Sequence, residues 1–302
     1  MDSTPDTNAS SLASRTRARV FGGPAAKVFN GMATLALGTG AAKVIALLAI
    51  PILTRLYSPE DFGALAVFTA FITILAPVIT LRYVLAIPLP RRDGMAINLM
   101  ALSGLLMLGM CAILAVMLWV FGGTLLGWFS MEALAPYWWL IVIGLVGASS
   151  YELLSLWATR KRAYKPISRT IAFQSLAGSA VKIGLGLLAL KPLGLLIGQV
   201  VTASAGTTAL ARRFWNDFKQ NRHYLSRRRM ALVAGRYRNF PIFRLPSQFL
   251  LVVATKAPLL FTAAIYDSAT TGQLGLAFMA LALPMTVLGN TMSKAYFAEI
   301  SA

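Results

Sequence analysis

Long apolar blocks of about 20 residues constrain this chain more than any other feature of its sequence. A helix of about 20 apolar residues crosses the roughly 30 Å of hydrocarbon in a membrane. Strands satisfy their backbone groups in lipid only as a closed barrel, and the alternation of apolar and polar residues that a barrel requires is absent from the sequence. With only 13% charged residues, the chain also has too little charge for the surface of a soluble domain. We therefore predict an all-α integral membrane protein, a polytopic bundle of about eight transmembrane helices.

One long basic segment divides these blocks into two groups. The predicted spans are 28–53, 62–87, 97–121, 136–157, 170–190, 193–211, 241–266 and 272–293. Breakers such as Pro88 and Pro90 or Gly122-Gly123 lie between them. We predict a disordered cytoplasmic tail at 1–27, an N-terminal six-helix lobe at 28–211, a basic cytoplasmic loop at 212–240, and the first two helices of a second, incomplete lobe at 241–302.

The basic residues predict the orientation of the bundle. With the N-terminus in the cytoplasm, the cytoplasmic segments hold 22 of the 28 Lys and Arg residues, and the opposite side holds only Arg55 and Lys191. Cytoplasmic loops carry such an excess of positive charge, so we expect both termini in the cytoplasm. Nine of these cations fall in 212–240, together with Trp215 and other aromatic residues. A nucleic-acid site has this composition, but the segment joins two membrane spans. We therefore interpret it as lying on anionic lipid headgroups and expect no nucleic-acid partner.

The chemistry-bearing residues argue against an enzyme. The chain has one Cys and one His, so it cannot form a disulfide, a zinc cluster or a histidine-based catalytic group. We interpret Cys111, within an apolar run, as a packing residue. No two of the ten acids lie together on the cytoplasmic side, where a nucleotide-sugar would bind with a metal. We predict no catalytic residue, no metal site and no cofactor.

A short internal echo suggests that the two lobes are repeats. Leu56-Tyr57-Ser58 precedes Gly63 as Ile265-Tyr266-Asp267 precedes Gly272, and Pro77 and Pro284 interrupt the following helices. Transporters are often built from two such halves. We therefore expect helices one and two to correspond to helices seven and eight.

The same segment carries a resemblance to a known family. The stretch Ile50-Pro51-Ile52-Leu53-Thr54-Arg55-Leu56-Tyr57-Ser58-Pro59-Glu60-Asp61-Phe62-Gly63 resembles the first loop of the bacterial O-antigen and exopolysaccharide flippases. These are the polysaccharide transporters of the multidrug/oligosaccharidyl-lipid/polysaccharide exporter superfamily. Arg82-Tyr83 with Ala86-Ile87-Pro88-Leu89-Pro90 is similar to the end of that family's second helix, and Asn239-Phe240-Pro241 with Leu245-Pro246-Ser247 to the start of its seventh.

The resemblance implies two six-helix lobes that alternately expose a central cavity to each side of the bacterial inner membrane. It implies an undecaprenyl-diphosphate-linked oligosaccharide as substrate, and membrane lipids, a polysaccharide polymerase or other export proteins as partners. Family members normally have twelve or more helices, so we expect a second lobe shortened after its second helix.

A diphosphate crossing hydrocarbon needs counter-charges, so the cations within or beside the spans are the candidate substrate-binding residues. Neighbours three and four positions away indicate which way each one faces. Small or polar neighbours accompany three of them, as in helix contacts or cavities, whereas Lys256 has aliphatic neighbours. The candidates for a cationic cavity are Lys43, Lys182, Lys256, Arg244, Arg55 and Arg82.

Alternative roles remain open for several of these residues. Arg82 and Arg244 lie near the cytoplasmic helix ends, from which they would reach the headgroups. Arg55 could meet the substrate at the outer mouth or pair with Glu60 or Asp61. Glu152, the one acid well inside a span, could pair with Lys182 or Arg82 or couple transport to protons.

The leading hypothesis is flipping of an undecaprenyl-diphosphate-linked oligosaccharide for polysaccharide or O-antigen export. One alternative is a truncated product that inserts in the membrane but transports nothing. The other is a cation or drug antiporter of the same superfamily, which would need acidic groups in the membrane.

Overall fold

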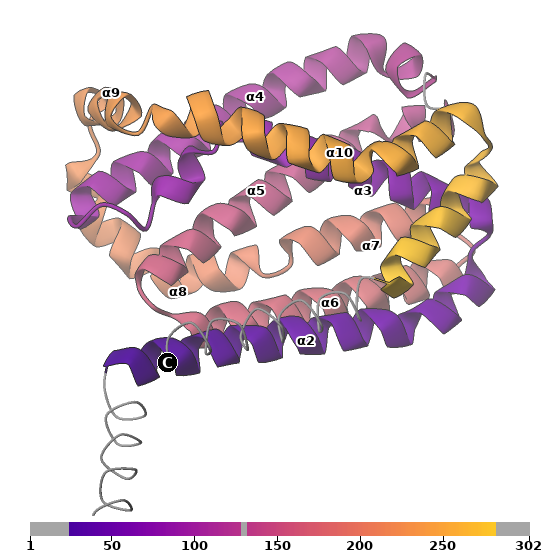
Figure 1. Cartoon of the computed structure of the whole chain (residues 1–302), viewed down its shortest axis with the longest axis horizontal. Helices are drawn as coiled ribbons and strands as arrows, with labels where there is room; N and C mark the ends of the chain where they lie inside the picture. The colour runs from indigo at the N-terminus through magenta and orange to yellow at the C-terminus, as the bar shows by residue number, and fades with distance from the viewer. Residues whose placement is uncertain (1–23, 128–131, 282–302) are drawn as a thin grey trace, which may run out of the picture.

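The structure is a computed structural model that describes residues 24–127 and 132–281. Within those ranges the chain forms helices and no strand (Figure 1). Seven of the described helical segments are long and apolar enough to cross a membrane. The prediction of an all-α polytopic membrane bundle is therefore confirmed. The predicted eighth span, 272–293, extends beyond the described residues, and its described part lies in a helical stretch at 268–281.

The helices follow one another with short connections. In chain order they are α2 (Pro24–Leu56), α3 (Pro59–Ile79), α4 (Asp93–Gly127), α5 (Trp138–Arg160), α6 (Tyr164–Leu187), α7 (Leu193–Ser204), α8 (Thr207–Asn221), α9 (Arg227–Arg236) and α10 (Leu245–Ile265). Three 3₁₀ segments, η1 (Tyr83–Ala86), η2 (Glu132–Tyr137) and η3 (Arg222–Tyr224), and the π-helical turn η4 (Phe240–Arg244) lie between them. The predicted tail at 1–27 falls mostly outside the described residues, and its last four residues already belong to α2.

The long helices run side by side, so the bundle has two ends (Figure 1). We call the end at which α9 lies the basic end, because the cationic segment 212–238 is located there. The turn from α2 to α3 and the turn after α10 lie at the opposite end. By the distribution of positive charge, we expect the basic end to face the cytoplasm.

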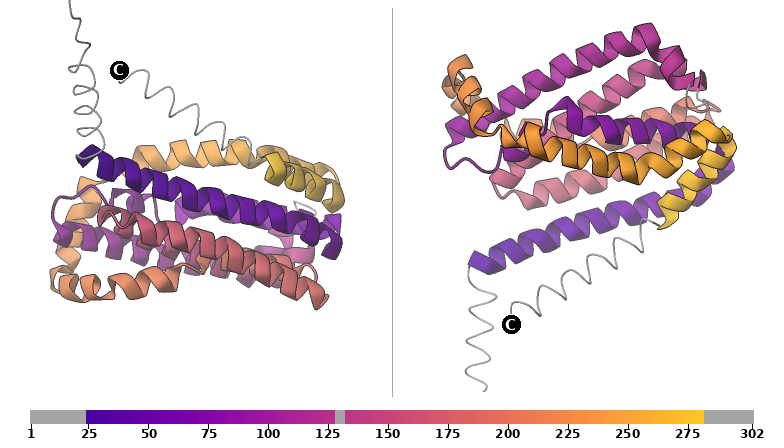
Figure 2. Two further views of the ribbon diagram at one scale, coloured as in Figure 1. Left: turned by 90° about the horizontal axis from the view of Figure 1, so that it is seen from below. Right: turned by 45° about the horizontal axis from the view of Figure 1, so that its top comes forward.

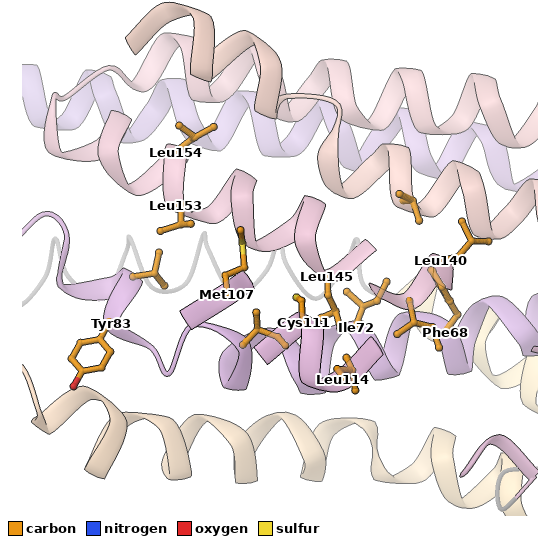
Figure 3. Close-up of a cluster of buried hydrophobic side chains, with 14 of the residues drawn as sticks. Phe68, Ile72, Tyr83, Met107, Cys111, Leu114, Leu140, Leu145, Leu153 and Leu154 are labelled. Carbon is orange, nitrogen blue, oxygen red and sulfur yellow. The ribbon is translucent and has the colours of Figure 1, made fainter. Parts of the chain in front are cut away.

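A core of apolar side chains joins α3, α4 and α5. Phe68, Leu145 and Trp157 are fully buried in it. Figure 3 shows Cys111 of α4 among these side chains, beside Met107, and Cys111 is a free, buried cysteine. The other face of α4 exposes large aliphatic side chains such as Leu108. A water-soluble surface would hide such a stripe, whereas lipid covers it at no cost.

Helices α2 and α6 pack closely along one seam, which Figures 1 and 2 both show. A Cβ atom on Gly38 would overlap Ser168, so glycine permits the close approach of the two backbones. Further along the seam the Ser175 hydroxyl donates to the carbonyl oxygen of Ala42 over 2.7 Å. Small residues and interhelical hydrogen bonds of this kind join helices where lipid provides no hydrophobic driving force.

The second predicted span, 62–87, ends earlier than expected. Helix α3 stops at Ile79, and Leu81 and Arg82 then adopt positive φ angles of 46° and 58°. These two left-handed residues turn the chain into η1, although the sequence, apart from Arg82, stays largely apolar as far as Ile87. The apolar run therefore continues past the end of the helix.

The third span is longer than predicted. Helix α4 covers Asp93–Gly127, so it includes Gly122 and Gly123, which we had interpreted as a border. A glycine inside a helix costs only about 1 kcal/mol relative to alanine. The long apolar stretch outweighs that cost, and the helix continues.

The sixth span and the basic loop also differ from the prediction. The segment 193–211 is split between α7 and α8 at Ala205-Gly206, and much of the predicted loop 212–240 is helical. Leu210, Phe214 and Phe218 recur every four residues and turn one face of α8 toward the core. Arg212, Arg213 and Lys219 are exposed on the other side, so α8 is an amphipathic helix.

Candidate functional site

The predicted ion pair inside the bundle forms between Arg82 and Glu152. The Arg82 Nη1 atom lies 3.2 Å from Oε1 of Glu152, with side-chain exposures of 13% and 28%. Of the two partners that we considered for Glu152, the structure selects Arg82 rather than Lys182. Burying either charge alone would be costly, and the pairing offsets that cost. Arg82 therefore neutralises Glu152 and does not line the central cavity described below.

Two other candidate cations lie away from the bundle interior. Arg55 is exposed at the end of α2, and no acid of the described chain lies within 4 Å of it. Asp61, one of its suggested partners, instead accepts a hydrogen bond from the backbone N–H of Ser58 at 2.9 Å. This bond completes a capping box that starts α3. Arg244 is exposed in the turn η4.

The remaining three candidates meet at one cavity of about 340 Å³. Lys43 of α2, Lys182 of α6 and Lys256 of α10 all contribute to its wall. Helix α3 and the helical stretch 268–281 complete the wall. Three lysines that lie far apart in the sequence therefore face a single space.

The rest of the cavity lining is small, apolar or hydroxylated. Among the described residues, none that lines it carries a carboxylate. Thr69 and Ser179 contribute hydroxyl groups, and the hydroxyl of Thr69 is buried with no hydrogen-bond partner in the described chain. The cavity therefore offers an anionic ligand three positive charges and, among its described residues, no opposing negative charge.

Lys182 is held in position by two residues that were not among the predicted site residues. Its Nζ atom donates to Oε1 of Gln199 over 2.9 Å, across the contact between α6 and α7. The hydroxyl of Tyr57 donates to the backbone carbonyl of Lys182 over 2.7 Å. Gln199 was detectable as the one amide side chain in the mostly apolar run Leu193–Ser204, where a buried lysine of a neighbouring helix needs a partner.

The crossing of α6 and α7 depends on glycine. A Cβ atom on Gly198 would overlap the side chain of Lys182, and one on Gly178 would overlap the hydroxyl of Thr202. The two backbones therefore approach closely enough for the short side chain of Gln199 to reach the ammonium group of Lys182. This arrangement leaves the Lys182 head group partly neutralised by a dipole rather than by a negative charge.

A tight contact between α3 and the stretch 268–281 lies beside the cavity, toward the opposite end. Gly63 of α3 lies against the carbonyl oxygen of Ser268, and Gly272 lies against the carbonyl oxygen of Pro59. One turn further inward, a Cβ on Gly275 would stand 2.9 Å from the Cβ of Ala66, and both residues line the cavity. The echo noted in the sequence therefore marks the place where its two copies touch.

A second charge cluster, at the basic end, was not anticipated. The carboxylate of Asp93 pairs with Arg160 at 2.7 Å and with Lys161 at 2.8 Å. Arg160 also donates to the carbonyl oxygens of Pro88 and Pro90. This cluster fixes the connection between η1 and α4 onto the end of α5, so we assign it a structural role.

Nowhere in the part of the chain that the structure describes do three or more His, Cys, Asp or Glu residues gather closely enough to hold a metal ion.

Comparisons with models of protein families, with curated proteins and with solved structures give no match for this chain.

Proposed function

We propose that this chain moves a polyprenyl-diphosphate-linked oligosaccharide across a bacterial inner membrane by alternating access. The observation that carries the proposal is the convergence of Lys43, Lys182 and Lys256 on one cavity whose described lining has no carboxylate. The resemblance of the segment 50–63 to the first loop of polysaccharide flippases suggests the substrate class.

The chemistry of flipping matches this site. Moving a lipid-linked sugar breaks no covalent bond, so the protein needs only to shelter a diphosphate from hydrocarbon. An isolated charge in the membrane interior is strongly unfavourable, and nearby cations offset that penalty. A volume of about 340 Å³ is at the lower end of the range of ligand pockets. The cavity therefore suits the charged head of the substrate better than its whole length.

Release on the far side requires the cavity to open. In the present structure Gly63 and Gly272 hold α3 and the stretch 268–281 in close contact near the opposite end (Figure 1). We assign this conformation to the state that precedes release, with the opposite end facing away from the cytoplasm. Separation of α3 from 268–281 is the movement that would complete transport.

An antiporter for cations or drugs fits the site less well. Carriers of that kind use acidic groups that face the substrate path. The interior acid Glu152 is already paired with Arg82, and neither residue lines the cavity. The alternative of an inserted but inactive product predicts binding of the lipid without movement, which the following experiment detects.

Reconstitution into proteoliposomes tests the proposal. An undecaprenyl-diphosphate-linked oligosaccharide is placed in one leaflet, and an impermeant glycosidase reports how much of the sugar reaches the other leaflet. We expect flipping by the wild-type chain and a drop of about tenfold or more in K43A/K182A, because each 1.36 kcal/mol of lost stabilisation slows a step tenfold. The control K165A/K191A removes two exposed lysines outside the cavity and should flip normally. Binding without any flipping by the wild-type chain would refute the proposal.

A further inference from the structure

The side of α8 near the basic end carries a second cavity, separate from the three-lysine site. It has a volume of about 490 Å³ and is lined by Ile97 of α4 and by Trp215, Phe218, Lys219, Arg222 and Leu225. Two cations thus border a hollow whose other walls are aromatic or aliphatic. None of these residues takes part in the proposed transport site.

The cavity lies at the depth where the apolar spans end. Phe218 packs against Trp157 of α5 with tilted rings whose centroids lie 5.4 Å apart. Ile97 and Trp157 are the first and last residues of two predicted apolar spans. A cavity at this level meets the boundary between hydrocarbon and headgroups, where tryptophan and cationic side chains are enriched in membrane proteins.

Two large apolar side chains at the cavity are exposed. Trp215 is 64% exposed and Leu225 is 43% exposed. Large apolar side chains exposed beside cations favour a lipid environment over water. Lys219 and Arg222 have no carboxylate within 4 Å in the described chain. Their charges are therefore available to an external anion.

Hydrogen bonds hold one side of this cavity in a fixed position. Asn98 of α4 is fully buried and donates to the carbonyl oxygen of Tyr224 over 2.9 Å. Its Oδ1 atom accepts from the backbone N–H of Ser226 over 3.1 Å. These two bonds hold the end of η3 and the following residues on α4, so Arg222 and Leu225 keep their places in the cavity wall.

We infer that this cavity binds an anionic phospholipid of the leaflet at the basic end. The phosphate would lie between Lys219 and Arg222, and the first part of the acyl chains would lie on Ile97, Phe218 and Leu225, with Trp215 at the rim. Anionic lipids are attracted to basic segments of the cytoplasmic leaflet. Such a lipid would hold α8 against α4 independently of any transported substrate.

Quenching of tryptophan fluorescence tests this inference. The purified chain is reconstituted in vesicles that contain brominated phosphatidylglycerol or brominated phosphatidylcholine, because bromine on an acyl chain quenches only nearby indoles. The contribution of Trp215, one of six tryptophans, is the difference between the wild-type chain and W215F. We expect this contribution to be quenched more by phosphatidylglycerol than by phosphatidylcholine.

Two charge-reversal variants make the test specific. K219E/R222E should weaken phosphatidylglycerol binding about thirtyfold or more, since losing two cations at about 1 kcal/mol each corresponds to roughly thirtyfold and the new carboxylates repel the phosphate. R227E/R228E makes the same change in charge at exposed positions of α9 outside the cavity and should leave the quenching intact. Equal quenching by both lipids, equal losses in both variants, or displacement of the lipid by a single-stranded oligonucleotide would overturn the inference. Because the readout involves no transport, it is independent of the proposed function.

Discussion

Gly63 and Gly272 lie opposite each other in a reciprocal contact: a side chain on either glycine would overlap the carbonyl oxygen four residues before the other. Pro59 precedes Gly63 by the same spacing as Ser268 precedes Gly272. The backbone N–H of Asp61 donates to the Ser58 hydroxyl before α3, and that of Thr270 to the carboxylate of Asp267 before 268–281. The two segments thus share a cap, a glycine and a contact surface, as repeats related by a local two-fold axis would.

This reciprocity makes the glycines sensitive to the smallest substitution. We expect G63A and G272A each to separate the two helices and to lower the thermal stability of the purified protein. The obstacle is backbone, which cannot move aside as a flexible side chain can, so a loss of roughly 1–3 kcal/mol follows. G104A is the control, because no atom lies within 4 Å of the position that its Cβ would occupy. Equal stability of G63A and G104A would show that the contact is absent in solution.

A cross-link across the same contact should stop transport. With Cys111 replaced by serine, A66C/G275C places two thiols where the Cβ atoms stand 2.9 Å apart, slightly closer than the roughly 3.8 Å of a disulfide. We expect the oxidised protein to retain its lipid ligand but to flip none, and reduction to restore flipping. Wild-type flipping rates in the fully oxidised protein would mean that α3 and 268–281 need not separate.

The pair of Arg82 and Glu152 should behave as a structural unit. E152Q leaves a guanidinium that is 13% exposed without its counter-charge, so we expect a loss of roughly 2–4 kcal/mol in stability. The double variant R82Q/E152Q removes both charges and should recover much of that loss. A double-mutant cycle of unfolding in denaturing detergent measures the coupling. If Glu152 instead couples protons to transport, E152Q will abolish flipping while stability stays unchanged.

Gln199 should act on the cavity through Lys182. In Q199L the ammonium of Lys182 loses its partner at 2.9 Å, so we expect the lysine to reorient and the affinity for the anionic ligand to fall. The loss of one hydrogen bond to a charged group corresponds to about 1.5 kcal/mol, which is roughly tenfold in affinity. Q199E supplies a negative charge beside Lys182 and should weaken binding of an anion further. Unchanged ligand affinity in both variants would show that Gln199 does not influence the binding site.

The membrane character of the fold could be predicted from the sequence, because the thickness of the membrane sets the length that an apolar block needs to cross it. The faces of Lys43 and Lys182 could also be inferred, since their small and polar neighbours lie one turn away on the same helix. Lys256 shows the limit of that reasoning. Its neighbours are aliphatic, yet it lines the cavity, because helix packing decides which face meets the other lobe.

Three local features could not be predicted, each for a physical reason. The end of α3 at Ile79 depends on two left-handed residues, and hydropathy carries no information on backbone angles. Most of α8 was predicted as a loop because its sequence is rich in basic residues, although Leu210, Phe214 and Phe218 repeat with helical spacing. The pairing of Lys182 with Gln199 required knowledge of which helices cross, which depends on tertiary packing.

The central claim is that Lys43, Lys182 and Lys256 together form an anion site, and a binding titration tests it most directly. Farnesyl diphosphate is titrated into the detergent-solubilised chain, with farnesol as the uncharged comparison. Replacing all three lysines with glutamine should weaken diphosphate binding roughly a hundredfold, at about 1 kcal/mol for each lysine, and leave farnesol binding unchanged. An unaltered affinity for the diphosphate in the triple variant would contradict the account.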